Sequence, residues 1–383
     1  MIRPETRQRR LSIGFPTPPA DGPMRFYPMT PESGELLVER GFDVVVEEGF
    51  GKEIKYSDEA YNRRGVRTAT RGETMSCDIV VSFPVPDKAD ASCLKRNAII
   101  FTFPEANESE LEFWQSCRMK KATVADLRSL RHESCGDGVF KDILDLLSGR
   151  AAILKAAGLL ADKENGKGIF MGGVPGTMPC EAVILGACRA GVEAARMALA
   201  LGASVKIFDH DSCLLGRAMK ACGERVMTSV YLPKVLMRSL READIVVYNE
   251  PDRGISFSSE VAEEMKKGVM VFNLSCHPAP FDGFVNVDLS RPIPEKKKGD
   301  ERRRCYVGAA MSVARSASMA FSDETVNLFS NLDGLYSRLN KFSFIRSIRQ
   351  CVMMYEGRAV RAEIAVITGS SPIDIDLLMQ ITS

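Results

Sequence analysis

The sequence predicts a mixed α/β protein in which helices alternate with the strands of parallel sheets. Short apolar runs rich in valine and isoleucine alternate with helix-like segments, a pattern typical of strands that are buried on both faces. Residues 182–211 read as a strand, a glycine turn, a helix and a second strand that ends in an acid. The chain of 383 residues is long for one hydrophobic core, so we expect two domains.

The first part of the chain is expected to alternate strands and helices. LSIGFP, residues 11–16, predicts a short apolar strand, and Thr30 is placed to cap a helix that ends at Gly41. Further strands are expected within the apolar runs at residues 42–51, 77–86 and 98–104. Residues 138–158 carry apolar side chains at helical spacing and predict a long connecting helix.

The second part begins after a break rich in glycine and proline, GIFMGGVPGTMP at residues 168–179, which we expect beside a domain boundary. Buried strands are expected within residues 243–250 and 268–278. The charged segment 291–305 mixes acids with its basic residues, which favours an exposed loop over a nucleic-acid patch. From Val313 onward we expect helices. Apolar residues expected in the core there are Met311, Val313, Met319 and Phe321.

Composition narrows the class of protein. The net charge of +1 gives no electrostatic reason to expect nucleic acid or a membrane surface as partner. No apolar run approaches the roughly 18 residues of a membrane-spanning helix, and the basic N-terminus does not resemble a signal peptide. None of the eleven cysteines forms a C-x-x-C pair, so we expect reduced, mostly buried thiols, no metal site and a cytoplasmic protein.

The strongest motif is the stretch AVILGACRAGVEAARMALALGASVKIFDHD, whose turn reads G-A-C-R-A-G. In a dinucleotide-binding βαβ unit three glycines permit the tight turn, the approach of the pyrophosphate and the packing of helix on strand. Gly186 and Gly191 hold the outer places, and Asp209 ends the next strand, where its carboxylate can accept both ribose hydroxyls and repel a 2′-phosphate. NAD is therefore favoured over NADP. The expected cofactor-binding residues are Gly186, Ala187, Cys188, Arg189, Gly191 and Asp209.

Cys188 stands where the pattern has its middle glycine. Its Cβ adds bulk where the phosphates approach, and left-handed backbone angles there would cost of order 1 kcal/mol or more. Two interpretations stay open: a NAD site that tolerates the cysteine, or a Rossmann-type fold that has lost its ligand.

Blocks along nearly the whole chain carry a family resemblance. MRFYPMTPESGELLVERGFDVVVEEGFGKEIKYSDEAYNRRG, GGVPGTMPCEAVILG, ALALGASVKIFD and YEGRAVRAEIA resemble segments of alanine dehydrogenase. FTFPEANESEL is closer to the related soluble NAD-binding subunit of proton-pumping transhydrogenase. The resemblance implies two Rossmann-like domains with parallel sheets, in which residues 1–150 and 310–383 form a discontinuous substrate domain around a central NAD-binding domain at residues 151–309.

The resemblance also implies an activity: hydride transfer between NAD and a small carboxylate-bearing substrate, linked to oxidative deamination of an amino acid, by a homo-oligomer (dimer or hexamer). In the family an arginine and a lysine hold the substrate carboxylate, and a histidine and an aspartate lie near the reacting carbon. The arginine falls on Arg25, whereas the lysine falls on Pro84 and is lost. The histidine falls on Glu105 and the aspartate on His277, and the N-M-P signature has no counterpart before Arg315.

The changes at Glu105 and His277 read together as an exchange, because an imidazole and a carboxylate can handle protons from either side of a cleft. The expected catalytic residues are therefore Arg25, Glu105 and His277, acting on a substrate other than alanine. Simpler roles stay open: Arg25 paired with a surface acid, Glu105 capping a helix, and His277 in a turn. Accordingly, a non-catalytic nucleotide-binding relative and a soluble transhydrogenase-like subunit remain alternative functions.

Overall fold

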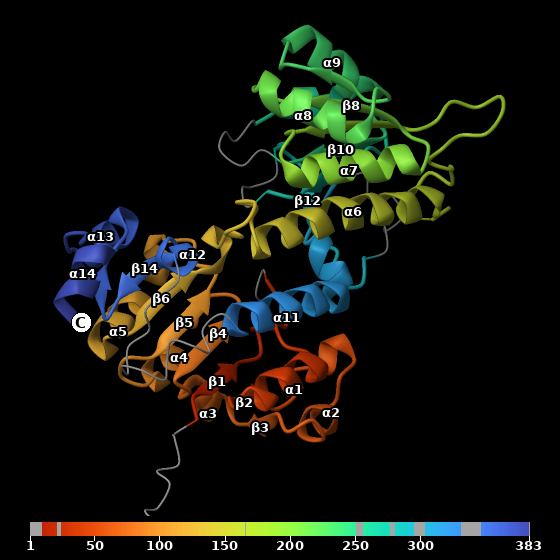
Figure 1. Cartoon of the computed structure of the whole chain (residues 1–383). Coiled ribbons are helices and arrows are strands. Elements are labelled where there is room, and N and C mark those ends of the chain that lie inside the picture. The colour runs from red at the N-terminus through yellow and green to blue at the C-terminus, as the bar shows by residue number, and fades with distance from the viewer. Residues whose placement is uncertain are drawn as a thin grey trace, which may run out of the picture. The chain divides into compact units, whose positions relative to one another are not determined.

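The computed structural model describes residues 10–20, 24–164, 166–249, 256–275, 280–294, 303–330 and 346–382. The chain divides into two compact units, each built around its own sheet (Figure 1). Unit 1 combines Met1–Ile143 with Ala314–Ser383, and unit 2 is Leu144–Val313. The fold is therefore α/β with two mostly parallel sheets, as the sequence predicts.

Unit 1 contains an eight-stranded sheet that is parallel from β6 to β3, while β14 and β15 add an antiparallel edge. Along the sheet the strands are β15 (Arg358–Ala359), β14 (Val352–Tyr355), β6 (Thr123–Asp126), β5 (Ile99–Thr102), β4 (Ile79–Ser82), β1 (Ser12–Phe15), β2 (Asp43–Glu47) and β3 (Arg67–Ala69). The strands expected around residues 11–16, 42–51, 77–86 and 98–104 are thus confirmed as β1, β2, β4 and β5.

Helices cover the unit 1 sheet on its two faces. They are α1 (Pro31–Glu39), α2 (Asp58–Asn62), α3 (Arg71–Met75), α4 (Lys88–Cys93), α5 (Leu111–Lys120), α11 (Ala314–Ser330), α12 (Arg346–Arg349), α13 (Ala362–Thr368) and α14 (Ile375–Thr382). Thr30 caps α1 as predicted, because its side chain accepts a hydrogen bond from the Ser33 N–H at 3.3 Å. On one face Val80 and Ile100 pack with Trp114 of α5 in a fully buried cluster.

Unit 2 contains a seven-stranded parallel sheet. Along it lie β12 (Val285–Asp288), β13 (Arg304–Val307), β11 (Met270–Asn273), β10 (Ile245–Tyr248), β7 (Glu181–Leu185), β8 (Ser204–Phe208) and β9 (Met227–Ser229). Its helices are α6 (Phe140–Ala161), which begins in unit 1, α7 (Arg189–Ala200), α8 (Ser212–Cys222), α9 (Pro233–Glu242) and α10 (Ser259–Glu264). The long connecting helix and the strands at 243–250 and 268–278 are confirmed.

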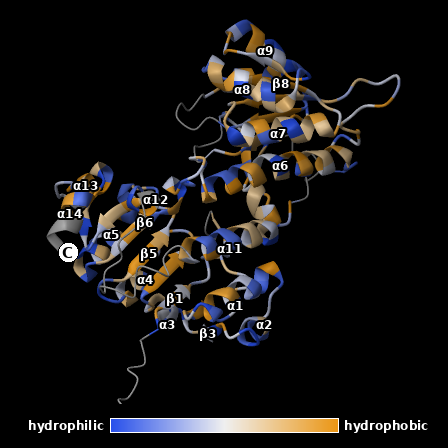
Figure 2. Ribbon diagram, viewed as in Figure 1, coloured by the Kyte–Doolittle hydropathy of each residue, from blue (hydrophilic) through white to orange (hydrophobic). Residues whose placement is uncertain are grey.

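Alternate residues of the central unit 2 strands β7, β10 and β11 enter two separate cores. Ile184 of β7 packs among residues of α6, α7 and α8, whereas Val183 packs among residues of α9 on the other face. Strands buried on both faces need apolar residues at every position, and this explains their unbroken apolar runs. Figure 2 shows the corresponding contrast, with strongly hydrophobic strands such as β4 and β5 and helices of mixed polarity.

Two expectations for the later part of the chain are wrong, and a third is wrong only at its end. The loop expected at 291–305 is irregular and mostly exposed over residues 291–294, and residues 295–302 lie outside the described part, but the segment ends inside β13, where Arg304 is buried. The region after Val313 is not wholly helical, because β14 and β15 add strands to the unit 1 sheet. Met319 is 51% exposed rather than in the core, since α11 turns it away from the face that buries Phe321.

Two further features concern the whole described chain. No helix within its described residues is long and apolar enough to cross a membrane. The ten cysteines that the structure describes form no disulfide, and six of them are buried.

Candidate functional site

The glycine turn of unit 2 joins β7 to α7. Gly186 follows β7 with a φ of +103°, a left-handed conformation that favours glycine. A Cβ on Gly191, in the first turn of α7, would lie 2.1 Å from the carbonyl oxygen of Gly186. The two outer glycines therefore serve the tight turn and the close packing of helix on strand, as the pattern requires.

Cys188 is the N-cap residue of α7, with φ −71° and ψ 177°. This is extended backbone that any residue adopts, so the expected strain at the middle position of the turn is absent and that expectation is wrong. The Cys188 thiol instead contacts Asn249, which directly follows β10: the Asn249 side-chain amide donates to Sγ, and Sγ donates to the Asn249 carbonyl oxygen at 3.3 Å. The side chain is thus directed across the turn toward the neighbouring strand.

β7 and β10 lie side by side, and the order of strands reverses between them. In open α/β sheets the crevice outside the carboxyl ends of such strands is the usual ligand site. Cys188 and Asn249 line this crevice, one from each strand end. Among the described residues no side chain caps α7 at Cys188, and the exposed Arg189 opens the helix, which favours an anion at this terminus.

Asp209 follows β8 and is 7% exposed. Its Oδ2 accepts a hydrogen bond from the N–H of Ala187 at 2.7 Å, and its Oδ1 accepts one from the N–H of Asp211 at 2.8 Å. Asp209, the acid that follows β8, is therefore hydrogen-bonded to the backbone of the glycine turn. Each carboxylate oxygen keeps a second lone pair, so a ribose hydroxyl can still donate to it.

Arg25 belongs to unit 1, and its side chain is largely buried, with 13% exposed. Its Nη1 lies 3.6 Å from Oε1 of Glu53, which is the pairing with an acid that the sequence left open. Burial, together with a hydrogen bond to the same Glu53, raises the pKa of Tyr27 far above its ordinary value. Arg25 therefore stands in a partly desolvated cluster where an anion would compete with Glu53 for the guanidinium.

Glu105 lies in the loop after β5 and is exposed. It does not cap the following helical turn, because Asn107 does so, and its carboxylate accepts a hydrogen bond from the Asn107 amide at 3.0 Å. Glu110 holds the loop in place: its carboxylate accepts from the N–H groups of Glu105 at 2.8 Å and Ala106 at 3.1 Å. The indole of Trp114 donates to the same carboxylate at 3.2 Å.

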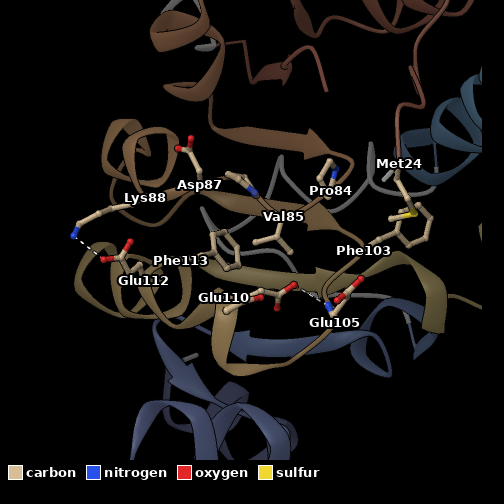
Figure 3. Close-up of a pocket in the computed structure, with 12 residues that line it drawn as sticks. Met24, Pro84, Val85, Asp87, Lys88, Phe103, Glu105, Glu110, Glu112 and Phe113 are labelled. Carbon is tan, nitrogen blue, oxygen red and sulfur yellow. Dashed lines mark hydrogen bonds and ion pairs between the residues drawn. The ribbon is translucent and has the colours of Figure 1, made fainter. Parts of the chain in front are cut away.

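An open pocket of about 370 Å³ lies between the loops after β4 and β5 and the first turns of α4 and α5 (Figure 3). Glu105 lines this pocket. Pro84, which stands where the family has its lysine, lines it as well. Met24, which immediately precedes Arg25, also lines it. The structure therefore brings Glu105 to a pocket in unit 1, whereas His277 lies outside the described residues and stays a prediction.

Sequence reasoning missed several residues of these sites. Asn249 is 61 residues from Cys188, and only the order of the strands brings them together. Lys88, Glu110 and Glu53 lie in ordinary charged stretches of the sequence, and no motif marks them. Lys88 lines the pocket and pairs with Glu112 at 2.8 Å, so the pocket does contain a lysine four positions after Pro84.

Two family models match most of the chain. The model of the "Alanine dehydrogenase/PNT, C-terminal domain" matches residues 152–362, and that of the "Alanine dehydrogenase/PNT, N-terminal domain" matches residues 25–142. The chain belongs to the alanine dehydrogenase/PNT family. Among its relatives, alanine dehydrogenase of Methanococcus maripaludis is 28% identical over 304 residues, which cover 78% of this chain and 81% of the relative.

Two solved structures share the fold of this chain. An L-alanine dehydrogenase matches with a TM-score of 0.74 at 20% identity, covering 94% of this chain and 99% of the other. A transhydrogenase from Sinorhizobium meliloti matches with a TM-score of 0.72 at 18% identity, covering 92% of this chain and 99% of the other.

Proposed function

We propose that this alanine dehydrogenase/PNT family member is a NAD-dependent oxidoreductase that oxidatively deaminates an amino acid other than alanine, or reduces the related 2-oxo acid. In this proposal residues 151–309 hold the dinucleotide, and residues 1–150 with 310–383 hold the substrate. The relatives that are alanine dehydrogenases support the reaction class.

The observation that carries the proposal is the bond between Asp209 and the N–H of Ala187. It fixes a carboxylate against the turn between Gly186 and Gly191, where the ribose of a dinucleotide would meet it while the pyrophosphate meets the start of α7. An acid at this position repels a 2′-phosphate, which favours NAD over NADP. The backbone of Cys188 is compatible with such a turn. Bound NAD would supply a hydride acceptor for the substrate carbon.

The chain's own residues would bind the substrate and handle its proton. Arg25 would exchange Glu53 for the substrate carboxylate, because a guanidinium fork can hold a carboxylate with two hydrogen bonds. His277 would take the proton released on oxidation, and Glu105 would orient the imidazole and favour its charged form. The loop bonds from Glu110 give Glu105 a fixed backbone for this role.

We also propose a cytoplasmic homo-oligomer, dimeric or hexameric. Support comes from residues 168–179, where Phe170 is 69% exposed, Val174 55% and Met178 85%. Apolar side chains so exposed on one short segment are typical of a surface that is covered by a partner.

The proposal is tested by calorimetric titration of the full chain with NAD, followed by spectrophotometric measurement of NADH formation with a panel of amino acids. We expect NAD binding and amino-acid-dependent NADH formation that is lost in Glu105→Gln and His277→Ala. Binding without turnover on any amino or oxo acid would instead indicate the non-catalytic relative. One observation favours that alternative: Arg25, the residue expected to bind the substrate carboxylate, is already paired with the carboxylate of Glu53.

A further inference from the structure

Three neighbouring strands of unit 2 set the direction in which a dinucleotide would lie. β7, β8 and β9 are adjacent and parallel, so their carboxyl ends meet at one edge of the sheet. The proposed function puts the pyrophosphate at the start of α7, after β7, and the ribose at Asp209, after β8. The adenosine end of the ligand would therefore point toward the residues that follow β9.

Three rings lie in contact at the ends of β8 and β9. Tyr231, in the loop after β9, stacks on the buried ring of Phe208 at the end of β8, with ring centres 6.2 Å apart and an angle of 26° between the planes. The exposed imidazole of His210 also contacts Tyr231, with ring centres 4.4 Å apart. His210 directly follows Asp209, and this contact directs its side chain toward the loop after β9, on the adenosine side of the site.

The loop after β9 also carries two exposed apolar side chains. Val230 is 41% exposed and Leu232 is 51% exposed, and they flank Tyr231 in the chain. An adenine ring placed here would cover apolar surface that is otherwise open to water. This loop therefore suits the nucleoside end of the ligand.

The charged groups near His210 differ in how openly they meet a ligand. Asp209 is 7% exposed, and both oxygens of its carboxylate accept backbone N–H groups. The Asp211 carboxylate caps α8, and Tyr231 is a titratable group that contacts the imidazole from the neighbouring loop. The imidazole of His210, by contrast, is exposed, so it would meet a group that projects from the ribose into solvent.

We propose that His210 is a second determinant of dinucleotide choice, whose imidazolium binds a 2′-phosphate and so weakens the selection of NAD by Asp209. The inference rests on the proposed function, because it concerns the cofactor choice of the same site. In Rossmann folds an arginine near the ribose-binding acid accommodates the 2′-phosphate of NADP, and a charged imidazole can supply the same attraction. Imidazole side chains gain their proton within the range from about pH 8 to about pH 5, so the selection of NAD should weaken as the pH falls.

The test is calorimetric titration of the full chain with NAD and with NADP at about pH 8 and about pH 6. In the wild type we expect the preference for NAD to fall by about two- to five-fold at the lower pH, the effect of one exposed ion pair. His210→Gln should show a smaller fall, limited to what protonation of the 2′-phosphate itself contributes at about pH 6.

His210→Arg carries its charge at both pH values and should bind NADP about two- to five-fold more tightly than the wild type at about pH 8. His132→Gln, which removes an imidazole from unit 1, is the matched control and should behave as the wild type.

Two results would overturn the inference while NAD binding leaves the proposed function standing. One is the same pH dependence in the wild type and in His210→Gln, and the other is an unchanged NADP affinity in His210→Arg. No binding of NAD by the wild type at either pH would contradict the proposed function itself, and the inference would fall with it.

Discussion

The thiol of Cys188 and the side chain of Asn249 are hydrogen-bonded to each other across the point where the strand order of unit 2 reverses. Cys188 stands at the start of α7, and Asn249 follows β10. The cysteine side chain therefore lies over the strand ends, in the crevice where the phosphates of a dinucleotide would approach. We therefore expect Cys188 to affect dinucleotide binding through the bulk of its side chain in the crevice and not through its backbone conformation.

Cys188→Gly should tighten NAD binding, because it removes a side chain from this crevice while glycine remains an acceptable N-cap residue. Cys188→Ser is the matched control: it retains a donor and acceptor for Asn249 and should bind NAD about as well as the wild type. Calorimetric titration measures both. Weaker binding by the glycine variant would show that the contact with Asn249 supports the site.

Gly191→Ala should destabilise the protein by about 1–3 kcal/mol, because its Cβ would meet the Gly186 carbonyl oxygen at 2.1 Å and force α7 away from β7. Gly216→Ala in α8 is the control, since its Cβ meets nothing within 4 Å, and it should stabilise by about 0.4–1 kcal/mol. Urea unfolding gives both values. Equal effects of the two substitutions would contradict the close packing at the turn.

Glu53→Gln should lower the KM for the amino acid by up to about five-fold with little change in kcat, because it releases Arg25 from its ion pair. Arg25→Lys should raise the KM, since lysine lacks the bidentate fork. The initial rate at varied substrate concentration separates KM from kcat. An unchanged KM in both variants would remove Arg25 from the substrate site.

Phe170→Ser combined with Met178→Ser should shift the protein toward a smaller oligomer, because it removes exposed apolar surface from residues 168–179. Met119→Ser, which changes a 74% exposed methionine on α5, is the control and should leave the oligomer unchanged. Light scattering coupled to size-exclusion chromatography measures the mass. A wild-type monomer would contradict the proposed homo-oligomer.

Much of the fold could be predicted because its signals are local. The βαβ spacing around Gly186 and the cap at Thr30 depend on neighbouring residues, and the structure has both. β14 was missed because a four-residue antiparallel strand is decided by its pairing with β6, not by its own sequence. The Cys188–Asn249 contact depends on strand order, which no local pattern specifies.

The candidate site of unit 1 was less predictable. The family pattern predicts a site residue at Glu105, and in the structure Glu105 lines a pocket. The residues that shape this pocket, such as Glu110 and Lys88, are ordinary charged residues in the sequence and acquire a role only through the loops that fold around them.

We propose that Asp209, whose carboxylate accepts the Ala187 N–H of the glycine turn, selects NAD over NADP. Calorimetric titration of the full wild-type chain with NAD and with NADP tests it most directly, with Asp209→Asn as the matched variant. We predict that the wild type binds NAD at least ~10-fold more tightly than NADP, because like charges at the ribose are disfavoured, and that the variant loses most of this difference. Equal affinity of the wild type for the two dinucleotides, or no binding of either, would contradict this role of Asp209.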